Sequence, residues 1–259
     1  MDRLPADFAN LAPDEQRRLR TAFRQASELG YRYSCPIIIG PRHDMQAPIN
    51  SASGTIVRRG SGYAFITADH VVASFQERAK TEQDLVAYLT NPTGPHPFDP
   101  RERILYRDGG ADVAVLHLEP KEALGPGALV YDRLPTNAQE PPAPSPGEFV
   151  VAAGFPKYFR ELVGRRDLQF NSYVVGTTVS SVYHDRFTST FSREHWISDR
   201  EGALGIDLLD LGGMSGGPVL RTSGLAFVLV GVVSQHHPEL DHMVCGRIDN
   251  VPISVWNAA

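Results

Sequence analysis

The sequence predicts an all-β protein whose strands form two groups, preceded by one N-terminal helix. Three observations support this prediction. Short strand-like runs, separated by Gly, Pro, Asn and Asp, fill the chain from Tyr31 onward. A proline-rich stretch divides these runs into two groups, and one amphipathic segment precedes them all. Many short strands at close spacing favour an antiparallel barrel or sandwich.

Residues 13–29 are the only segment with a convincing helical pattern. Proline suits the first turn of a helix, and the acidic residues beside it favour the positive end of the helix dipole. Gly30 is expected to end the helix. The apolar residues of one face are Leu19, Phe23 and Ala26. We expect this helix either to pack on the domain as an arm or to dock a regulatory partner protein.

The strand-like runs fall into two groups on either side of a connector over residues 135–147. Five prolines in the connector exclude a central strand and favour an extended chain. The first group contains residues 36–40, 54–57, 62–67, 85–90 and 113–118. The second contains residues 149–153, 168–182, 206–209, 219–220, 225–234 and 243–248. The predicted organisation is an N-terminal helical arm (1–30), a first β unit (31–134), the connector (135–148) and a second β unit (149–259).

Composition places the chain among ordinary soluble globular proteins. Hydrophobic residues make up 42% and charged residues 21%, and the formal net charge is -5. This charge, without a basic cluster, gives no reason to expect a nucleic-acid partner. The longest apolar run, residues 225–233, is too short to span a bilayer, so no membrane partner is expected. The acidic start is unlike a signal peptide. Only Cys35 and Cys245 are present, so we expect a reducing, cytoplasmic environment, although the two thiols could still pair.

Three short motifs carry residue types that suit nucleophilic catalysis. They are residues 67–72 (Thr-Ala-Asp-His-Val-Val), 111–116 (Ala-Asp-Val-Ala-Val-Leu) and 213–218 (Gly-Met-Ser-Gly-Gly-Pro). A serine hydroxyl is a poor nucleophile until a neighbour accepts its proton, and histidine suits that task near neutral pH. A carboxylate on the other ring nitrogen fixes the tautomer. The candidates are therefore His70, Asp112 and Ser215.

These motifs resemble those of the trypsin-like (chymotrypsin-fold) serine peptidases, of the bacterial and intracellular type. That family carries TA-x-H, D-[IV]-A-[LV] and G-x-S-G-G-P in this order, and Met214 and Val71 stand where many secreted members have aspartate and cysteine. The resemblance implies two antiparallel β-barrels with the active site in the cleft between them. It also implies a serine endopeptidase acting on protein or peptide substrates through an acyl-enzyme, with no cofactor and no metal.

The resemblance assigns further roles near the nucleophile. The backbone N–H groups of Gly213 and Ser215 would form the oxyanion hole, because glycine permits the unusual dihedral angles required there. Ser234 would contact the carboxylate of the triad and the substrate backbone. The remaining candidate substrate-binding residues are Leu209, Asp210, Gln235 and His236. A small apolar specificity pocket is the first expectation, and His236 could instead favour an acidic side chain.

Three other interpretations compete with this one. Ser215 also satisfies G-x-S-x-G, the nucleophile elbow of α/β-hydrolases, but glycine and proline after the serine do not start a good helix. A zinc site would use His236, His237, His242 and Cys245, whose spacing matches no standard structural site. The third is a latent or inactive peptidase-like module that needs a partner. Residues 184–203, expected to be a long loop, are a candidate regulatory element for it.

Overall fold

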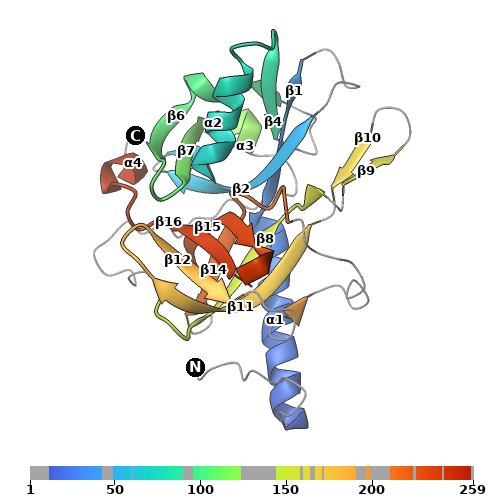
Figure 1. Cartoon of the computed structure of the whole chain (residues 1–259), viewed down its shortest axis with the longest axis vertical. Helices are drawn as coiled ribbons and strands as arrows, with labels where there is room; N and C mark the ends of the chain where they lie inside the picture. Colours follow the sequence, from blue (N-terminus) through green and yellow to red (C-terminus); the bar gives the residue numbers. More distant parts are fainter. Residues whose placement is uncertain are drawn as a thin grey trace.

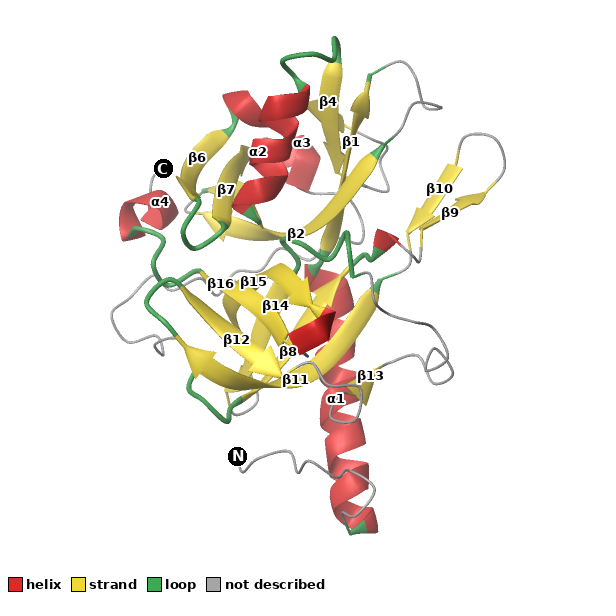
Figure 2. Cartoon of the chain, in the orientation of Figure 1, coloured by secondary structure: helices red, strands yellow, loops and turns green. Residues whose placement is uncertain are grey.

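The computed structural model describes residues 12–42, 49–59, 61–89, 96–123, 144–157, 160–163, 167–170, 172–190, 197–198, 211–223, 226–240 and 242–257. Two seven-stranded antiparallel sheets form two bodies, one above the other in Figure 1. Helices are few, as Figure 2 shows, so the molecule is mainly β. The connector over 135–148 lies largely outside the described residues, which resume at residue 144.

The first sheet is a curled half-barrel with the strand order β5-β4-β1-β2-β3-β7-β6. Each pair of neighbours is antiparallel, as expected for chain segments joined by short connections. Its strands are β1 (Cys35–Pro41), β2 (Asn50–Arg59), β3 (Gly62–Thr67), β4 (Leu85–Leu89), β5 (His96–Phe98), β6 (Ile104–Asp108) and β7 (Val113–Leu118).

The second sheet has the order β12-β16-β15-β14-β8-β11-β13, and pairing of β12 with β11 closes six of its strands into a barrel. Its strands are β8 (Phe149–Gly154), β11 (Tyr173–Val182), β12 (Arg186–Thr190), β13 (Ile197–Ser198), β14 (Pro218–Ser223), β15 (Ala226–His237) and β16 (His242–Arg247). A separate hairpin, β9 (Arg160–Val163) with β10 (Asp167–Phe170), stands out to one side in Figure 1. The predicted chymotrypsin-type fold is confirmed, with the first unit a half-barrel.

Among the described residues, three of the four buried apolar clusters form the cores of the two bodies and the contact between them. One fills the first sheet and includes Val72 and Phe75, and a second fills the closed barrel around Tyr173 and Met214. The third joins the sheets, because it combines first-sheet residues such as Ile66 with Leu220, Val232 and Trp256 from the C-terminal half. Burial of apolar surface across this boundary stabilises the relative position of the two bodies. The cleft between them therefore has fixed walls.

The N-terminal helix is longer than predicted. Helix α1 (Pro13–Tyr33) continues through Gly30 instead of ending there. Gly30 is buried, and a Cβ at this position would meet Ala153 Cβ at 3.0 Å, so glycine allows close approach to the second barrel. The C-terminal part of α1 packs on β8, β11 and β14, and the helix extends beyond the barrel in Figure 1.

Two other expectations need correction. The segment expected to be a long loop, residues 184–203, contains strand β12, which lies between β11 and β16 of the closed barrel. Its residues 191–196 and 199–203 lie outside the described part of the chain. The interpretation of residues 13–29 as the only helix was also wrong. Helix α2 (Asp69–Arg78) follows β3, and short turns α3 (Pro120–Ala123) and α4 (Ile253–Asn257) follow later.

Within the described residues, no helix combines the length and the apolar character that crossing a bilayer requires. Cys35 and Cys245 are both buried, and they form no disulfide in this structure, which answers the open question of their pairing. Burial raises the pKa of the Cys245 thiol, which therefore stays protonated and unreactive.

Candidate active site

His70 lies in the first turn of α2, at the point where the chain leaves β3. The helix is anchored because Val71, Val72 and Phe75 are buried in the core of the first sheet. This anchoring leaves the His70 side chain on the cleft side, with 47% of its surface exposed. The sequence placed His70 at a strand end, and the structure places it three residues beyond the end of β3, on helix α2.

Asp112 lies in the turn between β6 and β7, with a backbone φ of 56°. This left-handed conformation is uncommon outside glycine, although aspartate tolerates it better than most residues. The turn is held by Asp108, whose Oδ1 accepts hydrogen bonds from the N–H groups of Gly110 and Ala111, at 2.8 and 3.0 Å. The constrained turn directs the Asp112 carboxylate toward α2.

The Asp112 carboxylate accepts three hydrogen bonds. The backbone N–H of His70 contacts Oδ1 at 2.8 Å, the ring Nδ1 of His70 contacts Oδ2 at 2.8 Å, and the Ser234 hydroxyl contacts Oδ2 at 2.5 Å. Burial acts to raise the pKa of this carboxyl, but the hydrogen bonds from His70 and Ser234 outweigh burial and lower the pKa below its ordinary value. The carboxylate is therefore ionised at neutral pH and can only accept hydrogen bonds from its partners. It follows that Nδ1 of His70 donates to this carboxylate, so that in the neutral ring Nε2 is the acceptor.

Ser215 lies in a tight turn that only glycines on either side allow. Gly213 and Gly216 have φ values of +98° and +84°. A Cβ at Gly216 would overlap the carbonyl oxygen of Ser53 and the hydroxyl of Thr67, so the first sheet touches this turn directly. The N–H of Gly216 donates to the Val233 carbonyl at 2.7 Å, which fixes the turn to β15.

The two amides expected to form an oxyanion hole are those of Gly213 and Ser215. The carbonyl of Gly212 accepts a hydrogen bond from the N–H of Lys157 at 2.6 Å. Because a trans peptide places its N–H opposite its carbonyl, the Gly213 N–H points away from Lys157. Among the described residues, neither the Gly213 nor the Ser215 N–H has an acceptor. Both are available to a ligand oxygen.

His70 and Ser215 line the same cavity, of about 460 Å³. Within the described part of the chain, no hydrogen bond joins these two side chains. The Ser215 hydroxyl instead contacts the Ser234 carbonyl oxygen at 3.4 Å, which is a long and weak hydrogen bond. The nucleophile and base candidates therefore share a cavity in an arrangement that a substrate would have to tighten.

Three of the predicted substrate-binding residues line this cavity, namely Ser234, Gln235 and His236. The structure adds Leu211, Gly212, Val233 and His237 to its lining. Leu209 and Asp210 lie outside the described residues. The histidines of this region do not gather into a metal site: within the described residues, no group of three His, Cys, Asp or Glu side chains is placed to hold a metal ion.

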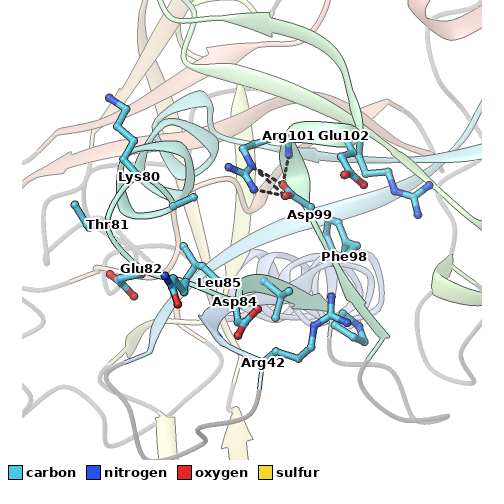
Figure 3. Close-up of a pocket in the computed structure, with 15 residues that line it drawn as sticks. Arg42, Lys80, Thr81, Glu82, Asp84, Leu85, Phe98, Asp99, Arg101 and Glu102 are labelled. Atoms are coloured by element: carbon cyan, nitrogen blue, oxygen red, sulfur yellow. Dashed lines mark hydrogen bonds and ion pairs between the residues drawn. The ribbon is translucent and has the colours of Figure 1, made fainter.

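A second cavity, with a larger volume of about 720 Å³, lies elsewhere. It is shown in Figure 3, beside the end of α2, β4 and β5, and shares no lining residue with the cavity at Ser215. Two of its acidic side chains form ion pairs: Asp99 with Arg101, at 2.6 Å, and Glu82 with Arg78 of α2, at 2.7 Å. It contains no nucleophile and base pair, so it is not the candidate active site.

Comparison with known proteins agrees with the geometry. The sequence profile of the trypsin-like peptidase domain matches residues 52–232, more than half of the chain. The chain belongs to the trypsin-like peptidase family. Among curated proteins, none matches this sequence.

Two solved structures share the fold of this chain. The crystal structure of Deg5 has a TM-score of 0.52 and 17% sequence identity, and the alignment covers 96% of this chain and 100% of that one. The active form of the Rv3671c protease from M. tuberculosis has a TM-score of 0.50 and 16% identity, with 92% and 87% coverage. At such low identity these likenesses show that this trypsin-like chain shares their fold, and no more.

Sequence reasoning missed residues that shape this site from a distance. Ser53 and the segment 155–157 contact the turn that bears Ser215, and Arg107 forms an ion pair with Asp69, the residue before His70. The only local signal was Gly54, which follows Ser53 and which the sequence placed in an ordinary strand. A Cβ at Gly54 would clash with Phe65, so the glycine marks a close approach of β2 to β3.

Proposed function

We propose that this protein is a serine endopeptidase that cleaves protein or peptide substrates through Ser215, His70 and Asp112. The observation that carries the proposal is that the ionised Asp112 accepts two hydrogen bonds from His70. His70 in turn lines the same cavity as Ser215. This arrangement supports an imidazole held in the tautomer that a general base requires. Membership of the trypsin-like peptidase family supports the same reaction class.

The proposed reaction is acyl transfer followed by hydrolysis. Ser215 Oγ attacks the carbonyl carbon of the scissile peptide while its proton passes to His70 Nε2. The N–H groups of Gly213 and Ser215 donate to the developing oxyanion, and the negative charge of Asp112 stabilises the imidazolium. His70 then protonates the leaving amine, and a water activated by the same histidine releases the acyl group. The reaction needs no cofactor.

Substrate preference rests on the cavity beside β15. We propose a small apolar P1 side chain, because Val233 and the aliphatic Leu211 are among the cavity walls. An acidic P1 side chain is the alternative, since His236 lines the same cavity. Cleavage of a peptide library distinguishes them, and a profile dominated by lysine or arginine would contradict both.

The decisive experiment is fluorophosphonate labelling followed by mass spectrometry. The probe forms a bond between Ser215 Oγ and phosphorus, and the P–F bond breaks to release fluoride. We expect one adduct, located on Ser215, and none on the Ser215→Ala variant. An unlabelled wild-type protein that is folded by circular dichroism would contradict the proposal.

A second candidate function is a latent peptidase-like module that requires a partner. The observation in its favour is the missing hydrogen bond between His70 and Ser215, whose hydroxyl contacts the Ser234 carbonyl instead. We propose that a regulatory protein would bind the exposed part of α1, where Arg17 and Arg24 are exposed. Labelling in cell extract should then be faster than in buffer, and Arg17→Glu with Arg24→Glu should abolish the increase. Equal rates in extract and buffer would contradict regulation through α1.

A further inference from the structure

Ser53 is a buried polar residue at the junction of the two sheets. It lies in β2, and none of its surface is exposed. Burying a hydroxyl costs free energy unless the hydroxyl forms hydrogen bonds, so its partners indicate why it is there. Those partners belong to the second barrel, more than a hundred residues away in sequence.

The Ser53 hydroxyl forms two hydrogen bonds with the second barrel. It donates to the carbonyl oxygen of Gly213 at 2.6 Å and accepts from the N–H of Phe155 at 2.9 Å. The backbone N–H of Ser53 donates to the carbonyl oxygen of Ser215 at 2.8 Å. One residue of the first sheet therefore holds both residues whose amides face the candidate oxyanion hole.

Gly213 is held on both sides by this arrangement. The preceding peptide is fixed where the Lys157 N–H donates to the Gly212 carbonyl, and the following peptide is fixed where Ser53 Oγ donates to the Gly213 carbonyl. Between them, glycine has no Cβ to restrict its dihedral angles, so these hydrogen bonds supply the restriction. The direction of the Gly213 N–H depends on them.

The same residue is also linked to the strand that leads to His70. The carbonyl oxygen of Ser53 accepts a hydrogen bond from the Thr67 hydroxyl at 2.7 Å, and Thr67 is the last residue of β3. Ser53 thus joins the segment before the base candidate to the turn that bears the nucleophile candidate. Errors in their relative position matter, because displacements of about 1 Å cost about 10²-fold in rate.

We propose that Ser53 is a positioning residue that sets the oxyanion hole through its hydroxyl. This proposal rests on the proposed peptidase function, because it assigns Ser53 a role in the same reaction. Removal of the hydroxyl leaves the Gly213 carbonyl without its donor and the Phe155 N–H without its acceptor. The Gly213 amide then loses one of the hydrogen bonds that fix its direction, while Ser215 and His70 remain in place.

The test compares Ser53→Ala with the matched control Ser189→Ala. Ser189 is equally buried, in β12, and its hydroxyl has no hydrogen-bond partner among the described residues. The readout is the second-order rate constant for labelling by a fluorophosphonate, whose phosphoryl oxygen occupies the oxyanion hole. Loss of a whole donor costs about 10²–10³-fold. Because the Gly213 donor is displaced and not removed, we expect Ser53→Ala to label about 10- to 100-fold more slowly, and Ser189→Ala to label at the wild-type rate.

A spectroscopic measurement separates positioning from general destabilisation. In the labelled protein, the ³¹P chemical shift of the adduct reports hydrogen bonds to the phosphoryl oxygen. We expect the resonance to move in Ser53→Ala and to stay unchanged in Ser189→Ala, with both variants folded at the assay temperature. An unchanged rate and resonance in a folded Ser53→Ala would overturn the proposal.

The outcomes also separate this proposal from the proposed function. If the wild-type protein is not labelled at all, the peptidase function fails first. If the wild type is labelled and Ser53→Ala is labelled equally fast, only the role of Ser53 fails. Should Ser53→Ala not fold, Ser53→Cys keeps the shape with a weak donor, and it is expected to label more slowly than wild type. Wild-type labelling by a folded Ser53→Cys would contradict the role of the hydroxyl.

Discussion

The two walls of the cleft hold their candidate catalytic groups by different means. On the first-sheet side, His70 and Asp112 are fixed by side-chain hydrogen bonds, and each can be replaced by a residue of similar shape. On the second-barrel side, Gly213 and Ser215 present backbone amides, fixed by a turn with positive φ at Gly213. Substitutions on the first wall should therefore impair proton transfer without changing the shape of the site. Substitutions on the second wall should instead move the backbone amides.

The largest effect is expected on the first wall, from Asp112→Asn. The amide keeps the shape of the side chain but no longer favours the tautomer with a proton on Nδ1 of His70. If the trypsin-like template holds, turnover falls by about 10⁴-fold. The measurement is the rate of peptide or ester hydrolysis, with the fold checked by circular dichroism.

The control for this variant is Asp185→Asn. The Asp185 carboxylate accepts a hydrogen bond from Arg186, and within the described residues no hydrogen bond joins it to His70. Its replacement is expected to leave turnover unchanged. Near-normal turnover in Asp112→Asn would remove Asp112 from the mechanism. The expected difference between the two walls in their response to substitution would then be lost.

On the second wall, Gly213→Ala tests geometry without changing any titratable group. The backbone φ of +98° is unfavourable for alanine, and the new Cβ would lie 2.6 Å from the Phe155 carbonyl oxygen. The turn must shift, and the Gly213 N–H turns with it. We expect turnover to fall by about 10²–10³-fold, as for loss of one oxyanion donor.

Gly147→Ala is the matched control for strain at positive φ. Gly147 has a φ of +87°, but a Cβ there would meet no atom within 4 Å. This variant carries the same kind of backbone strain far from the cleft, so it should lose some stability and no turnover. Equal loss of turnover in both variants would mean that strain, and not the direction of the Gly213 amide, accounts for the effect.

The sequence was informative where function depends on a short local pattern. The unusual dihedral angles at Gly213 were predicted because glycine has conformations that other residues avoid, and that property is visible in one residue type. Ser53 was not predicted, because its hydroxyl acts on Gly213, 160 residues away. No local pattern in β2 indicates which carbonyl group of another sheet will be nearby.

The helices show the same limit. Helix α2 is short, and the pattern of its apolar residues Val71, Val72 and Phe75 is compatible with a helix and with a continuation of strand β3. It forms because these side chains fill the first sheet, which is a tertiary effect. Gly30 was expected to end α1, yet the helix passes through it, and the glycine allows the helix to approach the second barrel closely. Local propensity was overridden by packing in both cases.

A smaller effect is expected from Ser234→Ala, which removes a hydrogen bond between the two walls. The Ser234 hydroxyl, on β15, donates to Asp112 of the first sheet at 2.5 Å. A hydrogen bond to a charged group contributes about 1.5–3 kcal/mol. Because two hydrogen bonds from His70 remain, we expect turnover to fall only about 10-fold, measured beside Asp112→Asn. A loss as large as that of Asp112→Asn would mean that His70 alone cannot hold the carboxylate.

The smallest expected effect is on the pH dependence of stability, and it distinguishes the two walls most directly. The pKa of the Asp112 carboxyl is lowered in the folded protein, so its ionised form stabilises the fold above the ordinary aspartate pKa of about 3.9. That stabilisation is lost as the pH falls through the lower, folded-state value. The unfolding free energies of wild type and Asp112→Asn should therefore differ more at pH 7 than near pH 3, as measured by urea denaturation. For Gly213→Ala the difference from wild type should stay constant, because no titratable group changes. If the difference in unfolding free energy between wild type and Asp112→Asn were the same at both pH values, the charge of Asp112 would not contribute to the stability of the first wall.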